Sequence, residues 1–115
     1  MEGAVLCTFE DKKPSSSIFT VTGNYSTSKG SATINGKTYK TCVKMESSTS
    51  IDFAIAETCK MTVFFGDTET ASLKLNGTKK SASGSVYTET LAPGTYKITK
   101  ANSVNIYGIM LEPVE

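Results

Sequence analysis

The sequence contains no histidine, no arginine and no tryptophan. Without histidine, neither a Ser-His nor a Cys-His catalytic pair can form, so we expect no enzymatic activity of its own. All twelve basic residues are lysines and the net charge is only +1, whereas nucleic-acid-binding proteins typically show a clear basic excess that includes arginine. The apolar runs are far shorter than the roughly 20 residues that cross a bilayer. We therefore expect neither a nucleic acid nor a membrane as partner.

Cysteine is scarce as well. Cys7, Cys42 and Cys59 are widely spaced and lack the paired spacing of zinc ligands. We expect three buried, reduced thiols that act as small hydrophobic residues, while one disulfide plus a free thiol remains the alternative in an oxidising compartment. Cys42 has no histidine to activate it, and neighbouring lysines alone are weak support for a nucleophile.

The length and composition predict one folded domain. The chain has 115 residues, of which 38% are hydrophobic and 20% charged, so it has enough apolar material for a core and too mixed a composition for disorder. Its 14 serines and 17 threonines suit strands and turns better than helices. We treat residues 1–115 as a single unit and expect a monomer.

Apolar and polar residues alternate with period two in segment after segment, and each segment ends at turn-forming residues. This pattern predicts an all-β fold, an antiparallel and jelly-roll-like β-sandwich of about nine or ten short strands. The expected strands are residues 5–10, 17–22, 31–35, 38–46, 50–56, 59–66, 71–76, 85–91, 95–100 and 104–112. Asn35-Gly36 and Asn76-Gly77 predict tight hairpins, because type I′ turns need positive φ at both central residues.

The alternation also assigns faces. In the expected strand 38–46, one side carries Tyr39, Val43 and Met45, and the other carries Lys40, Cys42, Lys44 and Glu46. The first side should face the core. The same parity places a further set of apolar residues inward: Ile51, Phe53, Ile55, Met61, Val63, Phe65, Leu73, Leu75, Tyr96 and Ile98.

The carboxylates do not form an obvious site. Most lie in turns or on faces expected to meet solvent, so we do not predict a glycosidase pair. Asp67 and Glu69 share the turn 66–70, where oxygen ligands could gather around Ca²⁺, yet two acids in a turn are typical of any turn. We expect no metal and no cofactor.

The lysines carry more information. Lys40 and Lys44 share a side of the expected strand and would lie about 13 Å apart, a span suited to a linear polymer. A row of ammonium groups on a flat face would bind a polyanion. The alternative is that exposed lysines on strands keep the protein soluble and prevent edge-to-edge aggregation.

Several segments together resemble a known family: 34–46, the strand around 51–53, the hairpin 73–77, and the segments 93–98 and 106–111. They are similar to the small β-sandwich modules attached to bacterial pectate lyases, and most of all to carbohydrate-binding module family 77, whose ligand is pectin. The resemblance implies a secreted, non-catalytic module that holds a covalently linked plant cell-wall-degrading enzyme on homogalacturonan of low esterification. No signal segment is predicted within these residues, so it would lie elsewhere in a longer polypeptide.

The resemblance also implies recognition of galacturonate carboxylates by lysines instead of aromatic platforms. By this analogy the carbohydrate-binding residues are Lys29, Lys44 and Lys100, with Lys40 and Lys97 as second choices. Lys100 shares parity with Ile98 and reaches solvent only if its strand ends there, so Lys97 is the substitute. Tyr25, Tyr87 and Tyr107 could be surface rings, although core or rim packing is the more typical role.

Two other functions stay open from the sequence. A structural or adhesion β-sandwich without glycan binding would carry the same lysines only as solvated surface groups. A small polysaccharide lyase would need a strong base and usually a metal or an arginine, and the chain supplies only lysines.

Overall fold

The computed structural model describes residues 3–114, and these residues form strands joined by turns and loops. No helix among them is long and apolar enough to span a bilayer. The strands are β1 (Val5–Thr8), β2 (Phe19–Thr22), β3 (Tyr25–Ser26), β4 (Ala32–Ile34), β5 (Lys37–Tyr39), β6 (Cys42–Lys44), β7 (Ser50–Ile55), β8 (Cys59–Phe65), β9 (Ser72–Leu75), β10 (Thr78–Ser81), β11 (Val86–Leu91), β12 (Gly94–Lys100) and β13 (Asn105–Pro113).

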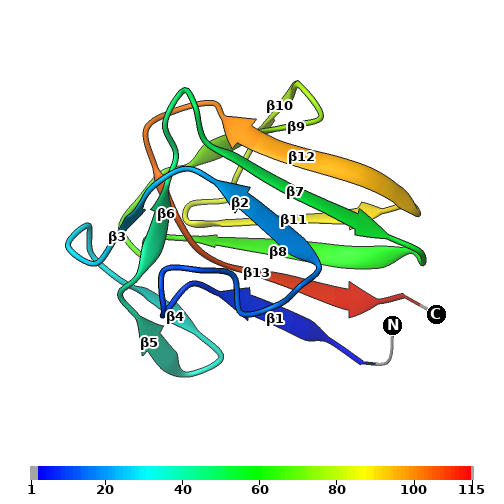
Figure 1. Ribbon diagram of the computed structural model, residues 1–115, viewed down its shortest axis with the longest axis horizontal. Coiled ribbons are helices and arrows are strands. Elements are labelled where there is room, and N and C mark those ends of the chain that lie inside the picture. Colours follow the sequence, from blue (N-terminus) through cyan, green and yellow to red (C-terminus); the bar gives the residue numbers. More distant parts are fainter. Residues whose placement is uncertain (1–2, 115) are drawn as a thin grey trace.

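Two antiparallel sheets form the layers of the molecule (Figure 1). One sheet has the order β11-β8-β13-β6-β3, with β1 also paired to β13, and the other has the order β10-β9-β12-β7-β2. A separate hairpin, β4-β5, forms a small third sheet. The predicted all-β antiparallel sandwich is therefore confirmed.

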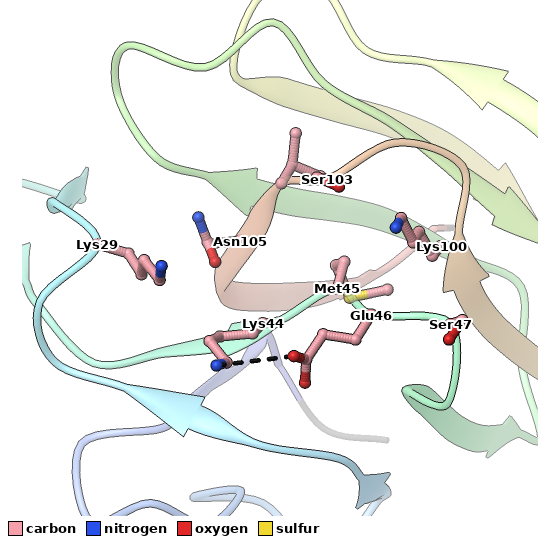
Figure 2. Close-up of a pocket in the computed structure, with 9 residues that line it drawn as sticks. Lys29, Lys44, Met45, Glu46, Ser47, Lys100, Ser103 and Asn105 are labelled. Carbon is pink, nitrogen blue, oxygen red and sulfur yellow. Dashed lines mark ion pairs between the residues drawn. The ribbon is translucent and has the colours of Figure 1, made fainter.

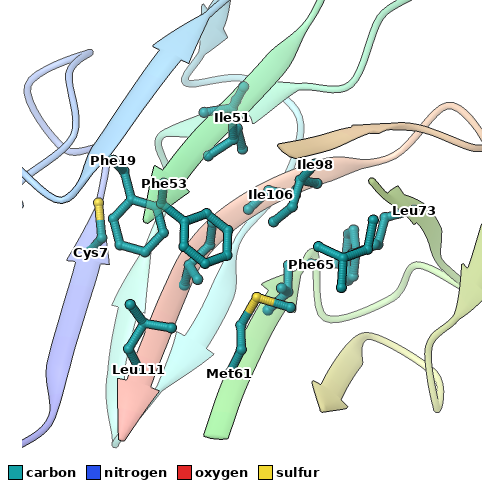
Figure 3. Close-up of a cluster of buried hydrophobic side chains, with 14 of the residues drawn as sticks. Cys7, Phe19, Ile51, Phe53, Met61, Phe65, Leu73, Ile98, Ile106 and Leu111 are labelled. Atoms are coloured by element: carbon teal, nitrogen blue, oxygen red, sulfur yellow. The ribbon is translucent and has the colours of Figure 1, made fainter. Parts of the chain in front are cut away.

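The core fills the space between the two large sheets (Figure 3). Ile51 and Phe53 from one sheet, and Met61, Val63 and Ile109 from the other, are at most 3% exposed. The inward positions predicted from the alternation are buried, except that Tyr96 is half-buried and packs against the edge of this core. Period-two patterning works here because each strand meets the core on one face and solvent on the other.

Hairpin turns were also predicted correctly. Asn35 and Gly36 have φ values of 51° and 82°, and Asn76 and Gly77 have values of 50° and 85°. Positive φ at both central residues is what a type I′ turn requires. The turn at Asn76 joins β9 to β10, whose sequence Thr-Lys-Lys-Ser has no apolar alternation. This strand was missed because its side chains give no periodic signal.

The predicted strand 38–46 is wrong. The structure divides it into β5 and β6, which belong to different sheets, with Lys40 and Thr41 between them. Lys40 and Lys44 therefore do not share the face of one strand. The two-residue strand β3 and the strand β10 were also not predicted, which explains why thirteen strands occur in residues 3–114 instead of about nine or ten.

The division of that segment creates a second, smaller core. The β4-β5 hairpin packs its apolar side against the outer face of the six-stranded sheet, and the cluster consists of Ala32, Ile34, Tyr39, Cys42 and Tyr107. Tyr107 is therefore core and not a surface ring, and Tyr25 and Tyr87 are half-buried against the main core. Covering this side makes β13 a strand that is buried on both faces.

Cys42 lies in this second core and not on a solvent-facing side with Lys40 and Lys44. The face assignment was wrong because it assumed that only one face of β6 is covered, whereas the prediction that Cys42 is a buried, reduced thiol is confirmed. Cys7, Cys42 and Cys59 are free thiols and all three are buried. Burial raises the pKa of the Cys42 thiol above its ordinary value, which favours the neutral form and suits a core residue better than a nucleophile.

Candidate functional site

Lys44 is the last residue of β6 and lies beside the start of β13. Its strand partner is Asn105, and its backbone N–H donates to the carbonyl oxygen of Asn24 at 2.9 Å. The preceding residue, Val43, points into the core and is fully buried. Because successive side chains point to opposite faces, Lys44 is directed away from the main core, with 32% of its side chain exposed.

Glu46 holds the Lys44 side chain in place. One carboxylate oxygen, Oε2, lies 3.6 Å from Lys44 Nζ, and the other, Oε1, accepts a hydrogen bond from Asn24 Nδ2 at 2.9 Å. The hydrogen bond from Asn24, together with the charges of Lys44 and Lys100, lowers the pKa of Glu46 below its ordinary value. Glu46 is therefore ionised at neutral pH and places a negative charge among these lysines.

Thr49 ties together the turn that follows β6. Its buried hydroxyl, Oγ1, donates to the carbonyl oxygen of Lys44 at 2.8 Å and accepts from the N–H of Glu46 at 3.1 Å. Gly23 lets the neighbouring loop pass close by, since a Cβ there would lie 2.8 Å from Thr49 Oγ1. The turn is thus fixed by a side chain that itself points away from solvent.

Replacing Thr49 by valine is expected to lower the free energy of unfolding by about 1–3 kcal/mol, because two partly buried backbone groups lose their partner while the side-chain shape is kept. Chemical denaturation measures this effect. Ser48→Ala in the same exposed turn is the matched control and should be near neutral. Wild-type stability of the Thr49→Val variant would show that the hydroxyl does not hold this turn.

Lys100 is the last residue of β12, at the point where the chain leaves the five-stranded sheet. It is half-buried. Its side chain still reaches solvent, because the strand ends at this residue. The connection 101–104 then crosses to the start of β13 in the other sheet (Figure 1). Lys100, which the alternation alone would have placed inward with Ile98, is therefore partly exposed.

Lys29 lies in the loop between β3 and β4 and is exposed. A bond from the Ser28 N–H to Ser26 Oγ, at 3.2 Å, shapes the start of this loop. Gly30 has φ of 125°, and a Cβ there would lie 3.6 Å from the Tyr107 hydroxyl. The loop therefore rests on the second core through a glycine whose backbone conformation other residues rarely adopt.

These segments surround one open pocket with a volume of about 420 Å³ (Figure 2). Lys29, Lys44 and Lys100 contribute three ammonium groups to it and Glu46 one carboxylate, so the lining carries a net charge of about +2 at neutral pH. The other lining residues are Met45, Ser47, Ser103, Val104 and Asn105. Such a pocket favours an anionic ligand that also offers hydroxyl groups.

The three first-choice lysines of the sequence prediction are thus brought together, and the two second choices are not. Lys40 lies between β5 and β6, and Lys97 lies on the five-stranded sheet, 3.8 Å from the Asp52 carboxylate. Neither of them lines the pocket. The condition that the sequence pattern set for Lys100 is met, because β12 ends at this residue and its side chain lines the pocket.

The sequence prediction missed the uncharged and acidic part of the pocket. Asn105, Ser47 and Ser103 line it together with Glu46, and Met45, which was expected only as core, is also part of the wall. One signal could have pointed to this region: two polar residues, Asn102 and Ser103, lie between Lys100 and the last strand. Polar residues between two strands can be assigned to a pocket only when it is known that their connection passes from one sheet to the other.

The acids of the turn 66–70 have protein partners. Asp67 accepts from the N–H and the hydroxyl of Thr33, at 3.1 and 3.2 Å, and Glu69 accepts from the N–H of Gly66 at 2.9 Å. Within residues 3–114 no group of three or more cysteine, aspartate or glutamate side chains is placed to hold a metal ion. The two carboxylates serve to fix the backbone around them.

Comparison with known proteins identifies the family. The model of carbohydrate binding module 77 matches residues 3–109. A solved structure from a study of glycan recognition in the Ruminococcus flavefaciens cellulosome is 41% identical, with a TM-score of 0.89, and the match covers 98% of this chain and 96% of that one. No curated protein matches the chain.

Two further solved structures are similar in fold alone, each at 19% identity. One is a peptidoglycan O-acetylesterase, with a TM-score of 0.57 over 96% of this chain and 33% of that one. The other is a GH26-CBM35 β-(1,4)-mannanase of Podospora anserina, with a TM-score of 0.54 over 100% of this chain and 28% of that one. The nearly complete family match and the 41% identical structure decide the assignment: the chain belongs to carbohydrate binding module family 77.

Proposed function

We propose that this module binds pectin, as homogalacturonan of low esterification, and that Lys29, Lys44 and Lys100 contact the galacturonate carboxylates. The observation that carries this proposal is the arrangement of three ammonium groups from separate segments around one open pocket. A polymer with a carboxylate on every residue offers charges along its whole length, so several lysines can engage it at once. The hydroxyl and amide groups between the lysines suit the sugar ring.

The expected affinity is modest. A solvent-exposed ion pair typically contributes about 0.2–1 kcal/mol, and Glu46 offsets part of the positive charge. Three such contacts and accompanying hydrogen bonds correspond to a dissociation constant between roughly micromolar and millimolar. Weak single-site binding is sufficient for a polymer ligand, because repeated sites and attachment to an enzyme raise the effective concentration.

The biological setting belongs to the same proposal. The module would act outside the cell, covalently linked to an enzyme that degrades plant cell walls. In support, the structure at 41% identity comes from work on a cellulosome. In addition, β1 begins and β13 ends at the end of the molecule opposite the β3–β4 loop and the β12–β13 connection (Figure 1). Attachment at either chain end would leave the pocket open.

Calorimetric titration with polygalacturonate and with fully methyl-esterified pectin tests the proposal. We expect binding to the first and none to the second, because esterification removes the carboxylate charge. Raising NaCl from about 0.1 to about 1 M, which shortens the Debye length from roughly 10 to roughly 3 Å, should weaken the binding at least severalfold. Equal affinity for the two polymers would refute recognition by charge.

A further inference from the structure

Glu69 fixes both the backbone and the side chain of Asn105. Its Oε1 accepts from the Asn105 N–H at 3.2 Å, and its Oε2 accepts from Asn105 Nδ2 at 3.3 Å. The carboxylate is itself anchored by the Gly66 N–H at 2.9 Å. Because Glu69 is itself held and binds Asn105 at both the backbone and the side-chain amide, the amide of Asn105 has little rotational freedom left.

This contact determines which end of the Asn105 amide meets the pocket. An ionised carboxylate only accepts hydrogen bonds, so the amide must turn its NH₂ group toward Glu69 and its oxygen away from it. Figure 2 shows the Asn105 oxygen on the side of Lys44 and the nitrogen on the opposite side. No group in residues 3–114 donates a hydrogen bond to Asn105 Oδ1, which leaves it available to a ligand.

The free oxygen complements the charged groups of this pocket. The lysines around it present only donors, and Glu46 is engaged by Asn24 and Lys44. Asn105 lies directly opposite Lys44 on the neighbouring strand. A ligand whose carboxylate meets Lys44 therefore has a fixed neutral acceptor beside it, and the matching group on the ligand is a donor.

We infer that Asn105 reads a sugar hydroxyl next to the carboxylate bound by Lys44, and that Glu69 is the positioning residue that holds its oxygen ready. Each residue of an α-1,4-linked galacturonan keeps free hydroxyl groups on C2 and C3, and these are donors. This inference rests on the proposed function and adds a specificity to it: the pocket distinguishes a polyuronate with free hydroxyls from one whose hydroxyls are acylated. Lysines alone cannot make that distinction, because O-acetylation leaves the carboxylate charge unchanged.

The experiment compares two proteins on two polymers by calorimetry or affinity electrophoresis: wild type and Asn105→Ala, each with polygalacturonate and with O-acetylated polygalacturonate. Asn105→Ala should weaken binding to the free polymer roughly threefold to tenfold, the effect of one neutral hydrogen bond. Acetylation should weaken wild-type binding by a similar factor. It should change the binding of Asn105→Ala by less than about twofold, because the contact is already lost.

Each outcome of this comparison either supports or refutes the role of Asn105. If acetylation weakens wild type and Asn105→Ala by the same factor, Asn105 supports the fold and does not read the hydroxyl, and the inference fails. It also fails if acetylation leaves wild-type affinity unchanged. Asn105→Ser, which likewise keeps the backbone bond to Glu69, provides a second variant if the alanine variant does not fold. Absence of wild-type binding to polygalacturonate would instead overturn the proposed function itself, and this inference with it.

Discussion

Replacing Lys44 by alanine is expected to abolish detectable binding to polygalacturonate. The change removes the ammonium group that lies 3.6 Å from the Glu46 carboxylate, on the residue paired with Asn105 across the strands, and it leaves Glu46 without its cation. The pocket then holds two ammonium groups and one carboxylate, so its net charge falls from about +2 to about +1. Lost attraction and new repulsion act together, which should weaken binding by more than tenfold and take a weak module below detection.

Two further variants make this result specific. Lys40→Ala removes an exposed lysine that does not line the pocket, so it should bind like wild type. Lys44→Ala combined with Glu46→Gln removes the repelling carboxylate and should recover part of the lost affinity. Affinity electrophoresis in gels that contain polygalacturonate compares all of them in one experiment. Equal retardation of Lys44→Ala and wild type would mean that Lys44 does not contact the polymer, and no retardation of either would favour a structural domain whose lysines only solvate it.

The main sandwich could be predicted from the sequence because its strands are amphipathic. Ile51, Phe53 and Ile55 alternate with less buried residues, and all three lie in the core. Where both faces of a strand are covered, the same reasoning fails. The alternation placed Cys42 on the same side as Lys40 and Lys44, and it gave no sign that the β4-β5 hairpin covers that side and buries Cys42 together with Tyr107. Period-two patterning assumes that one face of a strand meets solvent. It cannot show that another part of the chain covers that face.

The charged half of the pocket could be expected before the structure, whereas the polar half could not. Lysines are conspicuous in a sequence without arginine, and the family resemblance singled out Lys29, Lys44 and Lys100. Asn105 and Glu69 are 36 residues apart, and their pairing arises only because the start of β13 lies against the turn after β8. Contacts of this kind depend on sheet order, which local patterns do not encode.

Replacing Phe53 by alanine is expected to produce the largest loss of stability. Phe53 is 3% exposed, and it lies in register between Phe19 and Tyr96 on the neighbouring strands. Its ring centroid is 5.0 Å from that of Phe19 and 5.5 Å from that of Tyr96. Truncating such a ring typically costs about 3–5 kcal/mol through lost burial and the cavity left behind.

That cost is a large part of the roughly 5–15 kcal/mol that stabilises a domain of this size. The thermal unfolding midpoint should therefore fall by roughly 10–20 °C, measured by circular dichroism or calorimetry. Tyr96→Phe is the matched control: it keeps the ring and removes only a hydroxyl bonded to the Ala92 carbonyl at the surface, so its effect should be small. None of the three rings lines the pocket, and Phe53→Ala should still bind polygalacturonate at temperatures where it is folded. A loss below about 1 kcal/mol would mean that the two sheets do not pack through this aromatic row.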